Sequence, residues 1–90
     1  MTTYLEAIYD SRKSFYNKAV VIENEKGKSL MSYNTVVARI IDKNNGYIIP
    51  AYAEVYGIYS QTTLRHIKEF LKQNGFKAES KTQIEKDYLI

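Results

Sequence analysis

The segment SQTTLRHIKEFLKQNGF, residues 60–76, carries the signals for a complete helix. Ser60 is a good N-cap, because its hydroxyl accepts a hydrogen bond from a free backbone N–H of the first turn. Gly75 stands where a helix end favours a left-handed residue, and Phe76 follows it as the apolar contact of a Schellman cap. We predict a helix over residues 61–74. Its apolar stripe lies at i, i+3, i+6 and i+7: Leu64, Ile67, Phe70 and Leu71.

The chain before this helix has the composition of β-strands, with many β-branched and aromatic residues. The predicted strands are 15–23, 29–33, 35–41, 47–49 and 52–59. Turn residues separate them: Gly27 in a hairpin over 24–28, Asn34 at a bend, and Asn45-Gly46 as a type I′ signal. Strands followed by a helix, without βαβ alternation, predict an α+β fold. We expect an antiparallel sheet of four to five strands with one main helix of the C-terminal half packed on one face.

The two ends of the chain are less regular, although 90 residues predict a single domain over 1–90. Residues 1–11 form either a short helix or an arm, because Tyr4, Leu5, Ile8 and Tyr9 recur at helical spacing. Residues 77–90 are expected to dock as a tail, because the chain ends in Tyr88-Leu89-Ile90. A last strand and a short helix from Thr82 are the two alternatives.

Composition excludes several classes of function. The sequence has no cysteine, one histidine and one proline, so disulfides, thiolate zinc sites and cysteine nucleophiles are excluded. It has no glycine-rich phosphate loop, Gly-x-Ser-x-Gly elbow or His-Glu-x-x-His helix. No apolar run approaches the ~18 residues of a membrane span. We expect a cytoplasmic protein that is not an enzyme, with no catalytic residues, no cofactor and no metal.

His66 is the only residue suited to acid–base work at neutral pH. It could instead be a helix residue at the edge of the core, or a local partner of Glu69 at i+3. Arg65 and His66 have no evident core role, which favours contact with a partner.

Cations and tyrosines supply the other candidates for partner binding. Arg65, Lys68 and Lys72 form a stripe at i, i+3 and i+7, which is either a solvated helix face or part of a nucleic-acid surface. The sequence contains nine tyrosines, and the hydroxyls of so many rings cannot all find partners in a small core. At least two rings should lie on one surface near Arg12 or Arg65. The expected partner-binding residues are Arg12, Lys13, Tyr16, Tyr52, Tyr56, Tyr59, Arg65, His66, Lys68 and Lys72.

A helix-turn-helix is an alternative interpretation of residues 50–67. Ala53 would pack the first helix, Gly57 would make the turn, and Ser60 would open the recognition helix. Against it, Tyr52 and Tyr56 suit a strand better.

Three blocks of the sequence carry a family resemblance: DSRKSFYxKA (residues 10–19), SYNTxVA (32–38) and YSxTTxRHIKEFL (59–71). They resemble a family of small proteins of unknown function that phages, plasmids and integrative elements of Gram-positive bacteria carry. The resemblance implies a genetic context. Small accessory proteins of such elements often bind host machinery, and inhibitors of CRISPR nucleases are one such class.

Two hypotheses on function follow. The first is a small non-enzymatic module that binds a host protein and inhibits or modulates it. The alternative is a nucleic-acid-binding accessory protein, whose affinity would fall steeply with salt because binding neutralises phosphates.

Overall fold

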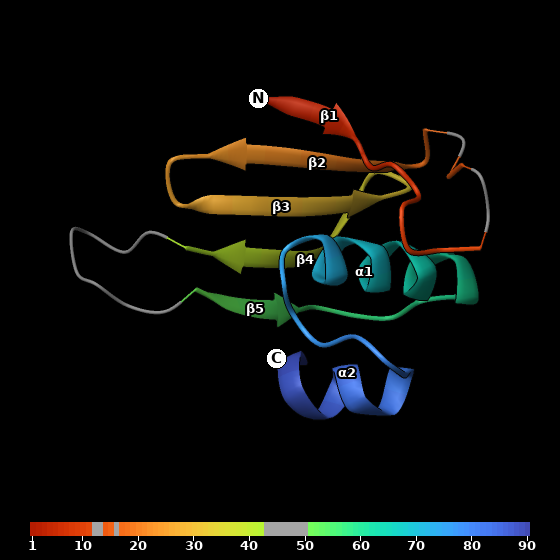
Figure 1. Cartoon of the computed structure of the whole chain (residues 1–90). Coiled ribbons are helices and arrows are strands. Elements are labelled where there is room, and N and C mark those ends of the chain that lie inside the picture. The colour runs from red at the N-terminus through yellow and green to blue at the C-terminus, as the bar shows by residue number, and fades with distance from the viewer. Residues whose placement is uncertain (12–13, 16, 43–50) are drawn as a thin grey trace.

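The chain folds into one antiparallel sheet and two helices in a computed structural model, which describes residues 1–11, 14–15, 17–42 and 51–90. The strands lie side by side in sequence order, and every neighbouring pair is antiparallel (Figure 1). This confirms the predicted α+β class. The elements are β1 (Thr2–Tyr4), β2 (Ala19–Asn24), β3 (Gly27–Ser32), β4 (Thr35–Ile41), β5 (Tyr52–Val55), α1 (Gln61–Gln73) and α2 (Lys81–Tyr88).

Tight turns join the central strands. Gly27 follows the turn between β2 and β3 with φ at +150°, a conformation that its missing side chain permits. Tyr33 and Asn34 alone connect β3 to β4, and both have positive φ, +51° and +71°. Two such residues make the turn whose twist matches a hairpin, and Asn34 was the bend expected from sequence.

The fifth strand is shorter than predicted and excludes one alternative. β5 ends at Val55 and pairs with β4 through Ala53, whose register partner is Ile40. Ala53 therefore lies in a strand, so the helix-turn-helix interpretation is wrong. The ladder to β4 satisfies the backbone of this segment, and the first helix has no place to form. The predicted turn at 42–46 and strand at 47–49 fall mainly outside the described residues, as does Pro50.

The main helix has both of the ends that its sequence predicts. The Ser60 hydroxyl accepts from the N–H of Thr63 at 3.1 Å. At the other end Gly75 has φ at +82°, and the N–H of Phe76 bonds the carbonyl of Leu71 at 2.9 Å. That bond, together with the one from Gly75 to the carbonyl of Lys72, is the Schellman cap.

The N-terminal segment is neither a helix nor a free arm. Thr2–Tyr4 form β1, which pairs with Val20–Ile22 of β2. The helical spacing of apolar residues was misleading here, because pairing with a distant strand outweighs a weak local preference. Leu5 is buried in the core, whereas Ile8 and Tyr9, which share the predicted apolar side, are exposed.

The C-terminal tail docks through a helix and then through its backbone. The Ser80 hydroxyl caps α2 by accepting from the N–H of Gln83 at 3.1 Å. Ile84 is the buried residue of α2. After the helix, the N–H of Ile90 bonds the carbonyl of Val55 at 3.0 Å, so the last residues extend along β5. Neither helix in the described part of the chain is long and apolar enough to cross a membrane.

One layer of side chains between α1 and the sheet makes the core. α1 lies across one face of the sheet, where it packs on β3 and β4, and α2 lies beside β5 (Figure 1). The predicted stripe of α1 is buried, with Ile67, Phe70 and Leu71 fully enclosed. Their neighbours in the core from the sheet are Ala19, Leu30, Val37, Ala38, Ile40 and Val55.

Candidate functional site

The face of the sheet opposite α1 carries a second set of apolar side chains. Leu30 and Ser32 of β3 point to α1, since Leu30 is in the core and the Ser32 hydroxyl lies 2.8 Å from His66 Nδ1. Side chains alternate along a strand, so Met31 points to the opposite side. Register partners share a face, and this assigns the same side to their neighbours. We call the large side chains on this side the open face: Tyr4, Val20, Ile22, Met31, Val36, Arg39, Ile41, Tyr52, Glu54 and Tyr56. The small polar residues Thr2, Asn24 and Ser29 lie on the same side.

Neither of the two helices covers the open face. Val36 is 37% exposed, and Tyr4, Tyr52 and Tyr56 are exposed as well. Five strands about 4.8 Å apart, with three to seven residues each, give the whole face a footprint of roughly 24 by 17 Å, or about 400 Å². Most of this face is apolar, and the largest apolar patch of a typical soluble monomer has a similar area and is often functional.

Few charges interrupt the open face. Arg39 and Glu54 are register partners across β4 and β5, so they form one cation beside one anion. The Tyr56 hydroxyl donates to Glu54 Oε1 at 3.0 Å. Burial, and then this hydrogen bond, raise the pKa of Tyr56 above its usual value, so the ring stays neutral. The surface is therefore apolar and close to neutral, which suits another protein better than a polyanion.

The predicted tyrosines divide between the open face and its border. Tyr52 and Tyr56 lie on the open face, whereas Tyr59 is 67% exposed beyond the end of β5. The expected neighbouring cation was Arg12 or Arg65. The prediction of Arg65 as a neighbour of Tyr52 and Tyr56 is wrong, because Arg65 lies on α1 at the other side of the sheet. A cation that lies near Tyr56 is Arg39. The remaining predicted residues Arg12, Lys13 and Tyr16 lie outside the described residues.

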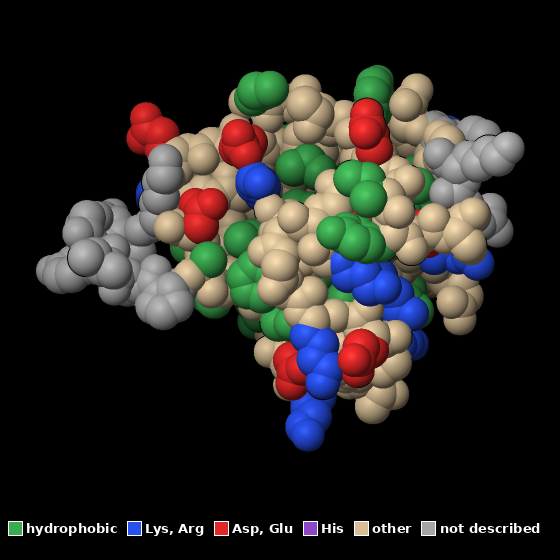
Figure 2. All heavy atoms as spheres, in the orientation of Figure 1, with side chains coloured by type: hydrophobic (Ala, Val, Ile, Leu, Met, Phe, Trp, Pro, Cys, Tyr) green, Lys and Arg blue, Asp and Glu red, His purple; other side chains and the backbone are tan. Residues whose placement is uncertain are grey.

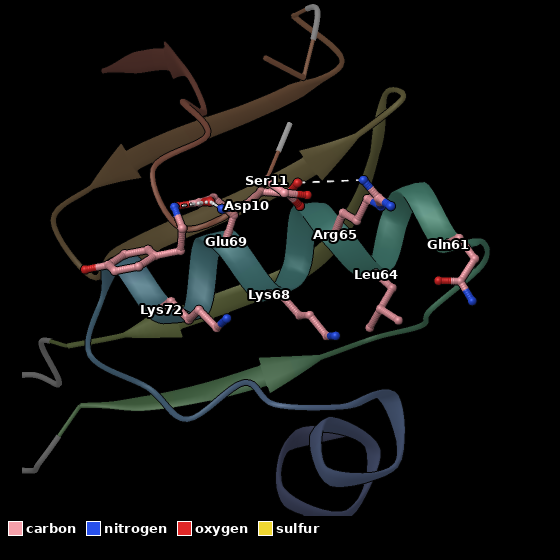
Figure 3. A pocket seen from close by; sticks show the side chains of 9 residues that line it. Asp10, Ser11, Gln61, Leu64, Arg65, Lys68, Glu69 and Lys72 are labelled. Carbon is pink, nitrogen blue, oxygen red and sulfur yellow. Dashed lines mark hydrogen bonds and ion pairs between the residues drawn. The ribbon is translucent and has the colours of Figure 1, made fainter. Parts of the chain in front are cut away.

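The predicted basic stripe lines a groove on the solvent side of α1. Figure 2 shows Lys and Arg side chains gathered over α1 and toward α2, with acidic side chains among the lower ones. The groove has a volume of about 290 Å³. Arg65, Lys68 and Lys72 line it together with Tyr9, Asp10, Ser11, Gln61, Leu64 and Glu69 (Figure 3).

Two carboxylates offset the charge of this groove. Arg65 Nη1 lies 3.7 Å from Asp10 Oδ1. Glu69 is 1% exposed, and its Oε1 accepts from the backbone N–H groups of Tyr9 and Asp10 at 2.8 and 2.9 Å. Gln73 Nε2 donates to the other oxygen at 2.7 Å. These bonds clamp residues 9 and 10 onto α1 (Figure 3), so Glu69 has a structural role.

His66 is a core residue. This agrees with the core alternative given by the sequence and corrects the assignment of His66 to a partner surface. Its side chain is 0% exposed, and the Phe15 ring meets it edge-on with centroids 4.9 Å apart. Burial lowers the pKa of His66, and nearby Asp10 partly opposes this, so the ring is neutral at neutral pH. The Glu69 carboxylate was suggested as a partner of His66. Its hydrogen bonds come instead from the backbone N–H groups of Tyr9 and Asp10 and from the Gln73 side chain.

Sequence reasoning missed the apolar residues of the open face and the buried role of Glu69. The sequence does carry a signal for the apolar residues of the open face. Residues 20–22, Val-Val-Ile, are apolar without alternation, and such a run in an antiparallel strand implies apolar side chains on both faces of the sheet. No such signal existed for Glu69, because its partners are backbone amides about 60 positions away. No group of three or more His, Asp or Glu side chains that could hold a metal ion occurs among the described residues.

A family model matches nearly the whole chain, residues 3–86. The chain belongs to the family of unknown function DUF8033. The match to DUF8033 begins within β1 and ends within α2, so it includes the whole of β2, β3, β4, β5 and α1. Comparison with curated proteins and with solved structures finds no match.

Proposed function

We propose that this protein is a small, non-enzymatic binding module whose open face docks against a protein partner. The observation that carries this is the uncovered apolar face of the sheet, with Val36 and three tyrosines exposed on it. Exposed apolar area is unfavourable in water, and burying it in an interface removes that cost. Tyr52 and Tyr56 add anchors of the type that dominates binding energy at protein interfaces.

The distribution of charge favours a protein over a nucleic acid. A nucleic-acid surface needs an excess of cations that follow the phosphate backbone. The open face has Arg39 beside Glu54, and the α1 groove sets Arg65, Lys68 and Lys72 against two carboxylates. Within the described residues, Lys68 and Lys72 are the groove cations on which the nucleic-acid alternative can be tested directly.

The setting of this function is the second part of the proposal. We propose that the module belongs to a mobile element and inhibits or modulates a protein of its bacterial host, with CRISPR nucleases as one class of target. The support for this part is the resemblance in residues 10–19, 32–38 and 59–71 to proteins of such elements. The open face supplies the means, because covering a host protein requires a surface and no chemistry.

Affinity capture from a nuclease-treated lysate of a Gram-positive bacterium tests the proposal with two matched double variants. Tyr52→Ala with Tyr56→Ala truncates the open face. Lys68→Glu with Lys72→Glu reverses charge in the α1 groove and leaves the open face intact. We expect the first variant to weaken capture of the partner by about 2 kcal/mol or more, which is about 30-fold. The second should bind as wild type does.

Two outcomes would contradict this assignment. Equal capture by the open-face variant and by wild type would show that the partner binds elsewhere. Partners that disappear after nuclease treatment, and with the Lys68 and Lys72 reversal, would transfer the function to nucleic acid. In that case retention on DNA or RNA should also fall by orders of magnitude between 50 and 200 mM salt.

A further inference from the structure

A second cavity, separate from the open face, lies at the start of α1. Its volume is about 280 Å³. Among the described residues, Ser14, Phe15 and Lys18 line it before β2, Tyr33 lines it from the turn between β3 and β4, and Thr62, Arg65 and His66 line it from α1. The N–H of Tyr33 bonds the carbonyl of Lys18 at 3.0 Å, so a main-chain bond joins two parts of this lining.

Three aromatic rings line it within the described residues. The His66 ring contacts Phe15, whose edge meets it with centroids 4.9 Å apart, and Tyr33, whose tilted ring has its centroid 5.8 Å away. Phe15 and His66 are buried, but Tyr33 is 52% exposed. Tyr33 thus stands at the opening, where its ring has one side against His66 and much of its surface free.

Tyr33 is an uncommon residue for its backbone position. It is the first of the two turn residues with positive φ, where glycine, asparagine or aspartate fits with less strain. The turn alone does not call for a tyrosine, and the ring adds little to the core because about half of it is exposed. The main contact of the Tyr33 side chain is with the His66 ring.

His66 also brings an unpaired nitrogen to this site. Nδ1 lies 2.8 Å from the Ser32 hydroxyl, whereas Nε2 has no hydrogen-bond partner within the described residues. When Ser32 donates to Nδ1, the neutral ring carries its proton on Nε2 and can donate it to an oxygen. An unpaired polar atom in a buried site is costly, and a hydrogen bond from Nε2 to a ligand oxygen would remove that cost.

Two cations of the described part of the chain also line the cavity. Arg65 reaches this cavity as well as the α1 groove, and its Nη1 is 3.7 Å from Asp10. A guanidinium has five N–H donors, so one such ion pair leaves others for a ligand. Lys18 supplies the second charge. Together they complement an anionic group beside an aromatic one.

We propose that this cavity binds an aromatic carboxylate, with the ring of the ligand against Tyr33 and Phe15 and its carboxylate toward His66, Arg65 and Lys18. Offset or edge contacts between rings favour an aromatic body. The same chemistry has two sources, a free small acid and the aromatic C-terminal residue of a polypeptide. The inference stands apart from the proposed use of the open face, because the two sites share no residue.

Titrations followed by NMR test this proposal with three probes: benzoate, acetyl-glycyl-phenylalanine with a free carboxylate, and the amide of that dipeptide. The signals to follow are the His66 ring and Tyr33. We expect saturable shifts with a Kd of about 1 mM or tighter for at least one acid, a modest value that suits a ligand of few atoms. Tighter binding of benzoate identifies a free acid as the source, and tighter binding of the dipeptide identifies a chain end.

Three variants make the test specific. His66→Phe keeps an aromatic ring and removes Nε2. Tyr33→Asn removes the tyrosine ring from the cavity, and asparagine fits the positive φ of this turn position. Each should weaken binding at least tenfold. Tyr59→Ala, at an exposed tyrosine that does not line this cavity, should bind as wild type does. Because Tyr33→Asn favours the turn, it remains informative if His66→Phe fails to fold. The absence of shifts with both acids, equal binding of the amide, or unchanged affinity in Tyr33→Asn would each overturn the proposal.

Discussion

The two faces of the sheet differ in what covers them, although both are rich in apolar residues. Val36 and Val37 are neighbours in β4, yet Val36 is 37% exposed and Val37 is 0% exposed. α1 packs on the side of Val37, and neither helix of the described residues lies over the side of Val36. The two faces therefore differ in their surroundings: the covered face forms the core, and the open face is exposed to solvent.

Truncating the covered face should give the largest loss of stability. Leu71 is fully buried between α1 and the sheet, so Leu71→Ala should lower the free energy of unfolding by about 2–5 kcal/mol. Val36→Ala is the matched change on the open face and should cost about 0.5 kcal/mol or less. Chemical denaturation measures both. Equal losses would mean that the open face is packed in the isolated chain.

The next largest effect should come from Glu69. Glu69→Ala leaves the backbone N–H groups of Tyr9 and Asp10 without their acceptor, which should cost about 2–3 kcal/mol. Glu79 gives the control, since its exposed carboxylate meets only Lys77, at 3.7 Å, and Glu79→Ala should change stability by about 0.5 kcal/mol or less. Amide exchange should also quicken at residues 9 and 10 in Glu69→Ala. Unchanged exchange there would contradict the clamp.

A smaller effect is expected at the end of α1. A Cβ at Gly75 would meet no atom within 4 Å, so Gly75→Ala tests the left-handed backbone alone. The variant should lose about 1 kcal/mol of unfolding free energy in thermal or chemical melts. Lys72→Ala, at an exposed position of the same helix, should be close to neutral. A neutral Gly75→Ala would argue against the Schellman cap.

The smallest effect near neutral pH should come from His66. Its pKa is lowered from 6.5 by burial, so the unfolded chain binds a proton more readily than the folded chain does. His66 therefore supports full stability above pH 6.5, and stability should fall as the pH drops through and below that value. His66→Phe should flatten the fall between pH 7.5 and 5.5 in denaturation series. An unchanged pH dependence would contradict the buried neutral ring.

The sequence predicts α1 and the central hairpins well because their signals are local. Ser60, Gly75 and the apolar stripe between them act within one helix, and Asn34 acts within one turn. Residues 1–11 were misassigned because β1 exists only by pairing with β2, which local spacing cannot indicate.

The candidate site was predicted only in part. Exposure of Tyr52 and Tyr56 could be foreseen, because rings with hydroxyls seldom all fit in a small core. A core position of His66 was one of two alternatives, and the sequence could not decide between them, because its contacts Ser32 and Phe15 are distant in sequence. The sequence also could not show that Arg65 lies away from Tyr52 and Tyr56, because only the fold reveals that the sheet separates them.

The most direct test of the central claim is methyl NMR of the isolated chain with a soluble paramagnetic agent. If one face of the sheet is covered and the other is exposed to solvent, the agent should strongly broaden the methyl signals of Val20, Ile22 and Val36. Those of Val37, Ile40 and Val55 should be protected, because these side chains are buried in the core. Equal protection of Val36 and Val37, which lie side by side in β4, would contradict the account, because the open face would then be covered already.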